Sequence, residues 1–189
     1  MGRARFAVEV RRRPAVEGAP AVVVDGVAHA FDAGGIDDVV FVIAPNPGEP
    51  PMPLARIASG GELSRVALAI EQVLAGADAT PTLVFDEIDA GIGGRSAEPV
   101  ARALWRLGRG RAVLCVTHLP VIAAYADAHV RIAKATRDGR TVTEVTQVSG
   151  EDRVAEVALM LGGPGGGPAA VAGAREMLVR AAGWRARPT

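Results

Sequence analysis

Apolar residues alternate with polar ones, or recur at helical spacing, along most of this 189-residue chain. Near its start, the alternation in Arg5–Arg11 predicts a half-buried strand. The stretch Ala21–Phe31 predicts a short hairpin that turns at an Asp-Gly pair. The continuous apolar run Val39–Ile43 predicts a buried strand. Five prolines between positions 45 and 53 then predict a stiff, extended connector.

The middle of the chain alternates helical and strand patterns. Helical spacing predicts a helix over Leu63–Ala75, ended by Gly76. Its residues expected to face the core are Leu63, Val66, Ala67, Ile70 and Leu74. The elements expected next are a buried strand at Thr82–Phe85, a turn at Gly91–Gly94, a helix at Ser96–Leu107, an apolar strand at Ala112–Thr117 and a short helix at Val121–Ala126. This order predicts an α/β fold, with a parallel layer and helices packed against it.

The last third of the chain predicts a hairpin and two helices. His129–Thr136 and Thr141–Val148 flank an Asp-Gly pair, which is typical of a β-hairpin. Glu151–Leu161 is amphipathic, and Ala169–Ala182 predicts the last helix. Between these helices, the glycine-rich stretch Gly162–Gly167 is interpreted as a flexible linker.

Composition indicates a soluble globular protein of a reducing, cytoplasmic setting. Hydrophobic residues make up 49% and charged residues 22% of the chain, with no apolar run of membrane-spanning length and no signal peptide. The single cysteine, Cys115, excludes an internal disulfide and is interpreted as a core residue. Basic and acidic residues number 21 each, so the net charge points to no particular partner.

The sequence contains no nucleotide-binding P-loop. That motif needs a lysine directly after a glycine-rich loop, because the lysine reaches the phosphates. Lys134 is the only lysine in the chain, and it stands in the sequence R-I-A-K-A-T. A phosphate cradle of this kind is therefore absent from the chain.

The stretch Ile57–Arg65, I-A-S-G-G-E-L-S-R, begins the first predicted helix with a capping box. Ser59 and Glu62 can satisfy backbone amides of the first turn reciprocally. Gly60 and Gly61 leave the backbone uncovered at the positive end of the helix dipole, where an anion binds favourably. The alternative is a well-capped surface helix without a ligand.

Polar residues follow two neighbouring predicted strands. Asp86 and Glu87 come directly after Thr82–Phe85, and His118 follows the next strand. Because α/β proteins bind ligands at the carboxyl ends of their strands, these side chains are candidates for one site. Asp86 would hold Mg²⁺, directly or through water, and Glu87 would orient or deprotonate an attacking water. His118 would contact a γ-phosphate or hold that water. The alternatives are solvated acids that open a turn, and a hydrogen-bonded histidine.

Three further residues carry weaker signals. Asp89, in I-D-A-G, is a candidate for contacts across a subunit boundary, with an Asx turn as the alternative. His29 and His129 belong to no cluster of histidine and cysteine at metal-ligand spacing. No structural metal site is therefore predicted.

Three motifs occur in an order that resembles ABC-type ATPase heads. Ser59–Arg65 resembles the signature motif, Thr82–Gly94 (T-L-V-F-D-E-I-D-A-G-I-G-G) the Walker B motif with its D-loop, and Val116–Pro120 (V-T-H-L-P) the switch histidine. Together with N-P-G-E at Asn46–Glu49, this form is similar to the RecN family, the bacterial SMC-like DNA-repair ATPases. The resemblance runs from about Arg5 to Gly163.

The resemblance implies a fold and a division of roles. The fold would be the C-terminal lobe of an ABC/SMC-type P-loop NTPase head, a parallel sheet flanked by helices, plus a C-terminal β-hairpin and helices. This lobe would take residues 1–163, and a glycine-rich linker with a terminal helix would take 164–189. In that family an N-terminal half-head carries Walker A and the Q-loop, which this chain lacks. The residues implied to contact ATP held by a second head are Ser59, Gly60, Gly61 and Glu62, with Asp89 at the boundary. Those implied to serve ATP and Mg²⁺ bound in cis are Asp86, Glu87 and His118.

Two functions stay open on the sequence alone. The first is part of an ATPase for DNA double-strand-break repair, in which ATP joins two heads and hydrolysis releases them. Its partners would be the N-terminal half of the same head, a second head in a homodimer, and DNA through the full-length protein. It would act at the nucleoid in the cytoplasm, with no membrane. The second is a non-enzymatic interaction or dimerisation module without its own nucleotide site, which the missing P-loop favours for the chain alone.

Overall fold

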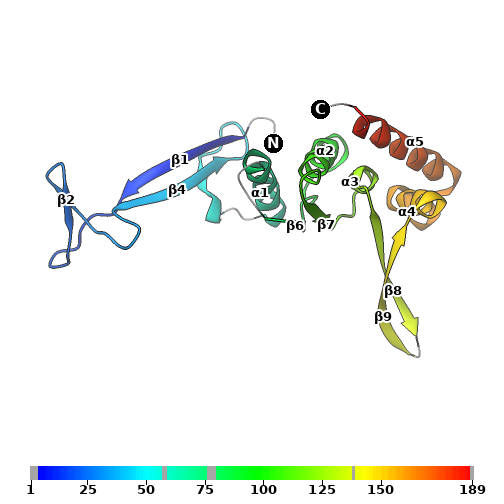
Figure 1. Ribbon diagram of the computed structural model, residues 1–189, viewed down its shortest axis with the longest axis horizontal. Helices are drawn as coiled ribbons and strands as arrows, with labels where there is room; N and C mark the ends of the chain where they lie inside the picture. Colours follow the sequence, from blue (N-terminus) through cyan, green and yellow to red (C-terminus); the bar gives the residue numbers. More distant parts are fainter. Residues whose placement is uncertain (1–3, 57–58, 76–79, 138, 188–189) are drawn as a thin grey trace. The chain divides into compact units, whose positions relative to one another are not determined.

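The computed structural model describes residues 4–56, 59–75, 80–137 and 139–187. The chain forms two compact units, Met1–Ser59 and Gly60–Thr189 (Figure 1). The predicted helix end at Gly76 lies outside the described residues. Among the described residues, no helix combines the length and the apolar character that crossing a membrane requires.

The first unit is built from antiparallel strands. The long strands β1 (Arg5–Arg12) and β4 (Asp37–Ala44) form a ribbon, and the short strand β5 (Met52–Pro53) adds to β4. The strands β2 (Val22–Val24) and β3 (Val27–His29) form a separate hairpin. The hairpin confirms the sequence prediction. The first strand is present as predicted, but it is exposed along nearly its whole length and not half-buried, because its apolar side chains Phe6, Val8 and Val10 face solvent.

The turn of the β2–β3 hairpin explains why an Asp-Gly pair predicts it. Asp25 and Gly26 have φ values of 51° and 78°. These left-handed values are those of a type I′ turn, whose twist matches that of the flanking strands. Glycine adopts them without a steric cost, and aspartate tolerates them better than most residues.

The apolar run Val39–Ile43 is a strand, but it is only partly buried. The last three residues of β4 are buried, whereas Val39 and Phe41 are 53% and 50% exposed. Val10 and Val8 lie opposite them on β1 and are exposed as well. The prediction of a buried strand is wrong for this half of β4, because its apolar row faces solvent.

The proline-rich segment is more structured than the predicted extended connector. Asn46 and Glu49 close a turn, in which the Asn46 Nδ2 donates to Glu49 Oε1 at 2.9 Å. The chain then forms β5 against β4, followed by the one-turn 3-10 helix Leu54–Arg56. The prolines therefore alternate with short hydrogen-bonded elements and do not form one uninterrupted rod.

The second unit alternates helices with strands in the predicted order. Its elements are α1 (Gly60–Leu74), β6 (Thr82–Phe85), the 3-10 turn Gly94–Ser96, α2 (Ala97–Leu107), β7 (Ala112–Cys115), α3 (Pro120–Tyr125), β8 (His129–Arg137), β9 (Arg140–Val148), α4 (Gly150–Gly162) and α5 (Gly167–Arg185). The β8–β9 pair is the predicted hairpin (Figure 1).

The predicted parallel layer is present as a pair of strands. β6 and β7 run parallel, from Thr82 opposite Ala112 to Phe85 opposite Cys115. Among the described residues this sheet has two strands, so the broad parallel sheet implied by the sequence is not seen. The helix α2 connects the two strands, as a parallel crossover requires.

The main hydrophobic core lies between this strand pair and the helices. Its buried members come from α1, α2, α3, α5, the end of β6 and the loop that follows it, and they are Leu68, Phe85, Ile88, Ala101, Leu104, Leu107, Ile122, Ala124, Tyr125 and Ala181. A second cluster joins α4 to α5 through Val154, Val157, Ala158 and Ala174. Each large side chain buried in this way contributes about 1.5–3 kcal/mol.

Helix α1 buries a different face from the predicted one. The predicted core residues that are exposed instead are Leu63, Ala67, Ile70 and Leu74. Val66 is buried as predicted, and Leu68 joins the main core. Periodicity identifies an apolar stripe, but it does not show whether a neighbour covers that stripe. In α1 the covered side is the one that carries Gly61, Arg65 and Leu68.

The glycine-rich stretch predicted as a flexible linker is a tight corner between two helices. Gly163–Gly165 forms a 3-10 turn, and α5 begins at Gly167. A Cβ on Gly166 would lie 2.7 Å from the Cβ of Ala170, so glycine permits the close approach of the chain segments here. The separate assignment of residues 164–189 stays a prediction.

Candidate active site

The predicted acids and the predicted histidine leave the parallel pair at the same edge. Phe85 ends β6 and Cys115 ends β7, and these residues are opposite each other in register. Asp86 and Glu87 therefore start their loop beside the segment that leads to His118. This is the edge where α/β proteins bind ligands.

A buried aspartate joins the two strand ends. Asp89 Oδ2 accepts hydrogen bonds from Thr117 Oγ1 at 2.6 Å and from the His118 backbone N–H at 2.8 Å, and it lies 3.0 Å from His118 Nδ1. The side chain of Asp89 is 5% exposed and that of His118 is 74% exposed. The imidazole is therefore tethered at one nitrogen, while most of its ring faces solvent. The role of Asp89 at a subunit boundary stays a prediction.

The same contacts decide the charge of Asp89. Burial of the side chain opposes ionisation, but the Thr117 hydroxyl, the His118 amide and the adjacent imidazole outweigh it. Together they hold the pKa of the Asp89 carboxyl below its usual value. The carboxylate is thus ionised at neutral pH, and it can orient the imidazole.

Asp86 and Glu87 are both exposed at the end of β6. Asp86 Oδ1 accepts the Glu87 amide N–H at 2.8 Å, and the Asp86 carbonyl accepts Ser64 Oγ at 2.8 Å. Glu87 has a φ of 55°, a left-handed conformation that residues with a Cβ seldom adopt. Residues with strained backbone conformations are found often at functional sites. Nothing in the sequence pattern predicts the left-handed conformation of Glu87.

The start of α1 packs directly on the loop that carries these acids. A Cβ on Gly61 would lie 2.8 Å from the Ala90 Cβ and from the carbonyl oxygens of Glu87 and Ala90, so this position requires glycine. A Cβ on the exposed Gly60 would meet the Glu87 carboxylate, at 2.2 Å. The two glycines therefore differ, since Gly61 permits packing and Gly60 lies beside Glu87 at the open start of the helix.

Arg65 is a site residue that the sequence analysis missed. Its Nη1 donates to the Ile88 carbonyl at 3.1 Å and to the Ala90 carbonyl at 2.8 Å. These two carbonyls flank Asp89, so the first two turns of α1 hold the backbone on either side of it. The available signal was the place of Arg65 within S-G-G-E-L-S-R, the motif that begins the helix.

The remaining two predicted residues lie beside the glycine pair. Ser59 directly precedes α1, and Glu62 stands in its first turn. An acidic side chain in the first turn interacts favourably with the helix dipole. The reciprocal capping bonds expected between Ser59 and Glu62 stay a prediction.

The donor set at this edge fits a metal ion that arrives with a nucleotide. Mg²⁺ usually binds one or two carboxylates and completes its shell with phosphate oxygens and waters. Asp86 offers one exposed carboxylate of this kind. Among the described residues, no group of three or more His, Cys, Asp or Glu side chains could hold a metal by itself.

Cys115 takes no part in the chemistry of this edge. It packs partly buried against the main core. Burial, together with the charges of Asp89 and Asp86, raises the pKa of its thiol to about 12. The thiol therefore stays protonated at neutral pH. The packing of Cys115 against the main core confirms its interpretation as a core residue.

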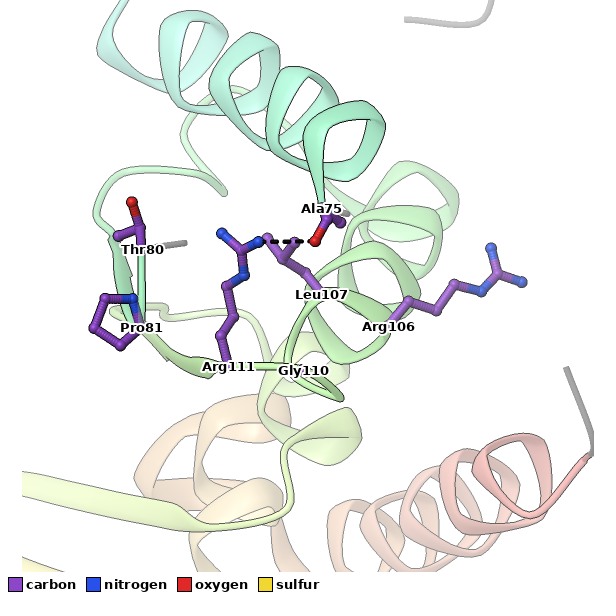
Figure 2. A pocket seen from close by; sticks show the side chains of 7 residues that line it. All are labelled: Ala75, Thr80, Pro81, Arg106, Leu107, Gly110 and Arg111. Atoms are coloured by element: carbon purple, nitrogen blue, oxygen red, sulfur yellow. Dashed lines mark hydrogen bonds between the residues drawn. The ribbon is translucent and has the colours of Figure 1, made fainter. Parts of the chain in front are cut away.

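A cavity of about 350 Å³ lies at the opposite end of the strand pair, near where β6 and β7 begin. In Figure 2, the Arg111 side chain points between Thr80 and Ala75, whereas Arg106 points away from the cavity. Arg111 is almost fully buried; it donates to the Ala75 carbonyl at 3.1 Å and pairs with Glu71 at 3.3 Å. None of the predicted site residues lines this cavity.

The fold of the chain is similar to that of an Smc head domain. A solved structure of the Smc head domain with a coiled coil and joint, from Pyrococcus yayanosii, matches 64% of this chain and 22% of that chain. Its sequence identity is 26% and its TM-score is 0.51. The likeness supports a mixed α/β fold of the SMC head type.

In sequence, the chain is related to the DNA repair protein RecN. It is 52% identical to RecN of Treponema pallidum over 144 residues, which are 76% of this chain and 25% of that protein. It is 43% identical to RecN of Streptomyces coelicolor over 178 residues, which are 94% of this chain and 31% of that protein. The chain thus spans about a quarter to a third of the length of these curated relatives. No protein-family model matches the chain.

Proposed function

We propose that the chain is the C-terminal lobe of a RecN-like ATPase head that acts in the repair of DNA double-strand breaks. The observation that carries the proposal is the link made by Asp89 between the Asp86–Glu87 loop and His118. In the complete head, Asp86 would hold Mg²⁺ and Glu87 would orient or deprotonate the attacking water. His118 would contact the γ-phosphate or hold that water.

The start of α1 would face the nucleotide of a second head. A helix N-terminus favours an anion, and Gly60 is exposed there. Ser59, Gly60, Gly61 and Glu62 would form this contact, with Asp89 near the boundary between the heads. Since Gly61 and Arg65 tie α1 to the loop of Glu87, one rigid connection would join the two nucleotide sites.

The remaining parts of the site would come from other polypeptide segments. The sequence has no P-loop, and its single lysine, Lys134, lies on β8. The N-terminal half of the same head would supply the phosphate cradle, and DNA would be engaged by the full-length protein. The relatedness to RecN supports a cytoplasmic, nucleoid-associated location.

Reconstitution tests this proposal. Co-expressed with the N-terminal half of a RecN protein, the chain should form a head that hydrolyses ATP. Glu87→Gln should lower the hydrolysis rate about 10²–10⁴-fold, as expected when a general base is lost, and should trap ATP-bound dimers in sedimentation. Ser59→Arg should prevent dimers, because the long side chain crowds the start of α1.

Glu144→Gln on β9 is the matched control, since it removes one negative charge from the hairpin, where half-buried Glu144 pairs with Arg137. This control should hydrolyse ATP at the parental rate. Parental hydrolysis by Glu87→Gln would contradict the role of Glu87. Its role would also fail if Glu144→Gln lowered the rate equally.

The missing P-loop keeps a second function open, that of a non-enzymatic interaction or dimerisation module. On either account the purified chain alone should show no ATP turnover, since it lacks the phosphate cradle. Calorimetry with Mg-ATP distinguishes the two functions after reconstitution. A reconstituted, folded head that neither binds nor hydrolyses ATP would favour the non-enzymatic module.

A further inference from the structure

The short helix α3 ends in carbonyl groups that need hydrogen-bond partners from elsewhere. The last four carbonyls of an α-helix have no partner within a regular helix. Because α3 has six residues, Pro120–Tyr125, most of its carbonyls are in this position. The placement of α3 therefore depends on donors from other elements.

Arg153, in the first turn of α4, supplies such donors. Its Nη2 donates to the carbonyls of Ala126, Ala123 and Ala124 at 2.7, 3.0 and 3.3 Å. In the part of the chain that the structure describes, the hydrogen bonds from the Arg153 side chain all end on these carbonyls. A positive charge at this end also interacts favourably with the helix dipole. Helix α4 thus holds the C-terminal end of α3.

A second arginine reaches the same end of α3 from α5. Arg185 Nη1 donates to the Ala126 carbonyl at 3.0 Å and to Asp127 Oδ1 at 2.9 Å. Burial and the nearby charge of Arg185 lower the pKa of Arg153. The Ala126 carbonyl accepts both guanidinium groups, so two helices converge on one point of the backbone.

The other end of this backbone segment leads to His118. Leu119 directly precedes α3, and its carbonyl accepts two amides of the helix at 3.1 and 3.2 Å. The Leu119 amide donates to Thr117 Oγ1 at 3.0 Å. Asp89 in turn accepts the Thr117 hydroxyl and the His118 amide. Residues 117–126 therefore form a hydrogen-bonded segment that is held by Asp89 at one end and by two arginines at the other.

We propose that Arg153 is a positioning residue for His118. It touches the C-terminal end of α3 and acts on the imidazole through the backbone between them. The His118 side chain is mostly exposed, so packing restrains it little and the path of its backbone largely decides where the ring lies. The consequence for ATP hydrolysis rests on the role of His118 in the proposed function.

The first test uses the chain as it is and needs no nucleotide. Arg153→Met removes the donors and keeps an unbranched apolar side chain. In amide hydrogen exchange followed by NMR, the His118 and Leu119 amides should exchange about tenfold faster than in the parent, because the segment opens locally. The reference is the Ala112 amide, which donates to the Pro81 carbonyl at 2.9 Å at the far end of β7. Its exchange should stay at the parental rate.

Arg175→Met on α5 is the matched control. The Arg175 guanidinium pairs with Glu151 of α4 at 2.9 Å, so this variant also removes an arginine contact between elements, but none with α3. It should exchange like the parent at His118. Equal acceleration in Arg153→Met and Arg175→Met would overturn the proposal, because it would indicate a general loosening of α4 and α5. Acceleration of the Ala112 amide by the same factor as His118 would overturn it too.

Arg153→Lys keeps the charge and can still donate hydrogen bonds, although it lacks the planar fork of arginine. Its His118 amide should exchange at a rate between those of the parent and Arg153→Met. This variant carries the test if Arg153→Met does not fold. A parental rate at His118 in every Arg153 variant would show that the arginine does not hold the segment.

The second test measures ATP hydrolysis by the head reconstituted with the N-terminal half. Arg153→Met should lower kcat about tenfold, since small misplacements of a catalytic group are costly, and should change KM by less than about twofold. Arg153→Lys should recover part of kcat, and Arg175→Met should keep the parental value. A parental kcat in Arg153→Met would overturn the proposal. If the parent head hydrolyses no ATP, the proposed function fails, whereas the exchange rates still decide whether Arg153 holds His118.

Discussion

The two faces of the parallel pair β6–β7 are both apolar, but only one is covered. The closed face packs against the main core, and its residues are Leu83, Phe85, Val113 and Cys115. The open face consists of Val84, Leu114 and the following Val116, which are 66%, 54% and 56% exposed. The two faces are thus similarly hydrophobic, but one is packed in the core and the other is exposed to solvent.

The difference indicates that β6 and β7 are strands whose second face is covered by another part of a protein. Strands that are covered on both faces have continuous runs of apolar residues, and β6 and β7 have that pattern. The chain itself covers one face with the main core. An exposed apolar row of this kind marks an interaction site. We expect the N-terminal half of the proposed head to cover it.

The largest expected effect comes from the closed face. Phe85 is 5% exposed and belongs to the main core, so Phe85→Ala should lower the free energy of unfolding by about 3–5 kcal/mol. Val84→Ala on the open face should change it by less than about 0.5 kcal/mol. Urea unfolding followed by far-UV circular dichroism measures both. Equal losses would mean that the two faces are covered alike.

A second prediction concerns the contact between α1 and the loop that carries Glu87. Gly61→Ala should destabilise the second unit by about 1–3 kcal/mol, the range for overpacking, because its Cβ would meet backbone atoms at 2.8 Å. Gly60→Ala is the control, since its Cβ would meet the end of the movable Glu87 side chain. Thermal melts of both variants check this difference. A Gly61→Ala variant as stable as Gly60→Ala would show that the loop carrying Glu87 and Ala90 moves to accommodate the added Cβ at little energetic cost.

The open face should change association more than stability. Val84→Thr with Leu114→Thr keeps strand-forming shapes and removes apolar surface, so it should reduce the binding of a hydrophobic dye and any self-association. Sedimentation velocity at several protein concentrations checks the second effect. If the parent chain is a monomer that does not bind the dye, the open face of β6–β7 is not an interaction surface.

The smallest expected effect is a pH dependence that comes from Asp89. Its pKa is held below the ordinary value by Thr117 and His118, so ionised Asp89 stabilises the fold at pH values above about 3.9, the ordinary aspartate pKa. That contribution is lost as the pH falls through the lowered pKa of the folded state. The stability difference between the parent and Asp89→Asn should therefore shrink below about pH 4. A difference that stays constant from neutral pH to pH 3 would contradict this assignment.

Local chemistry made much of the fold predictable. The Asp25-Gly26 turn requires left-handed backbone, and the sequence shows residues that adopt it. The strand ends at Asp86 and His118 follow from where apolar runs stop, so their meeting at one edge could be inferred. These features depend on residues close together in the sequence.

What could not be predicted depends on which surfaces meet in space. The exposed stripe of α1, with Leu63 and Ile70, looks the same in sequence whether or not a neighbour covers it. The left-handed backbone of Glu87 and the two carbonyl contacts of Arg65 arise from tertiary packing of α1 on the loop. Gly166 was interpreted as a flexible residue, because the nearness of Ala170 is not written in the local sequence.

The packing of α5 against α2 and α3 in the main core also determines what spectroscopy of this chain reports. The chain has two tryptophans and one tyrosine; Trp184 lies 5.5 Å from both Trp105 and Tyr125. Intrinsic fluorescence and near-ultraviolet dichroism therefore observe the junction of α5 with α2 and α3. The aromatic residues of the first unit are phenylalanines, so that unit is nearly silent in both signals. Unfolding curves from tryptophan emission and from backbone dichroism should coincide if the two units melt together, and separate if they melt independently.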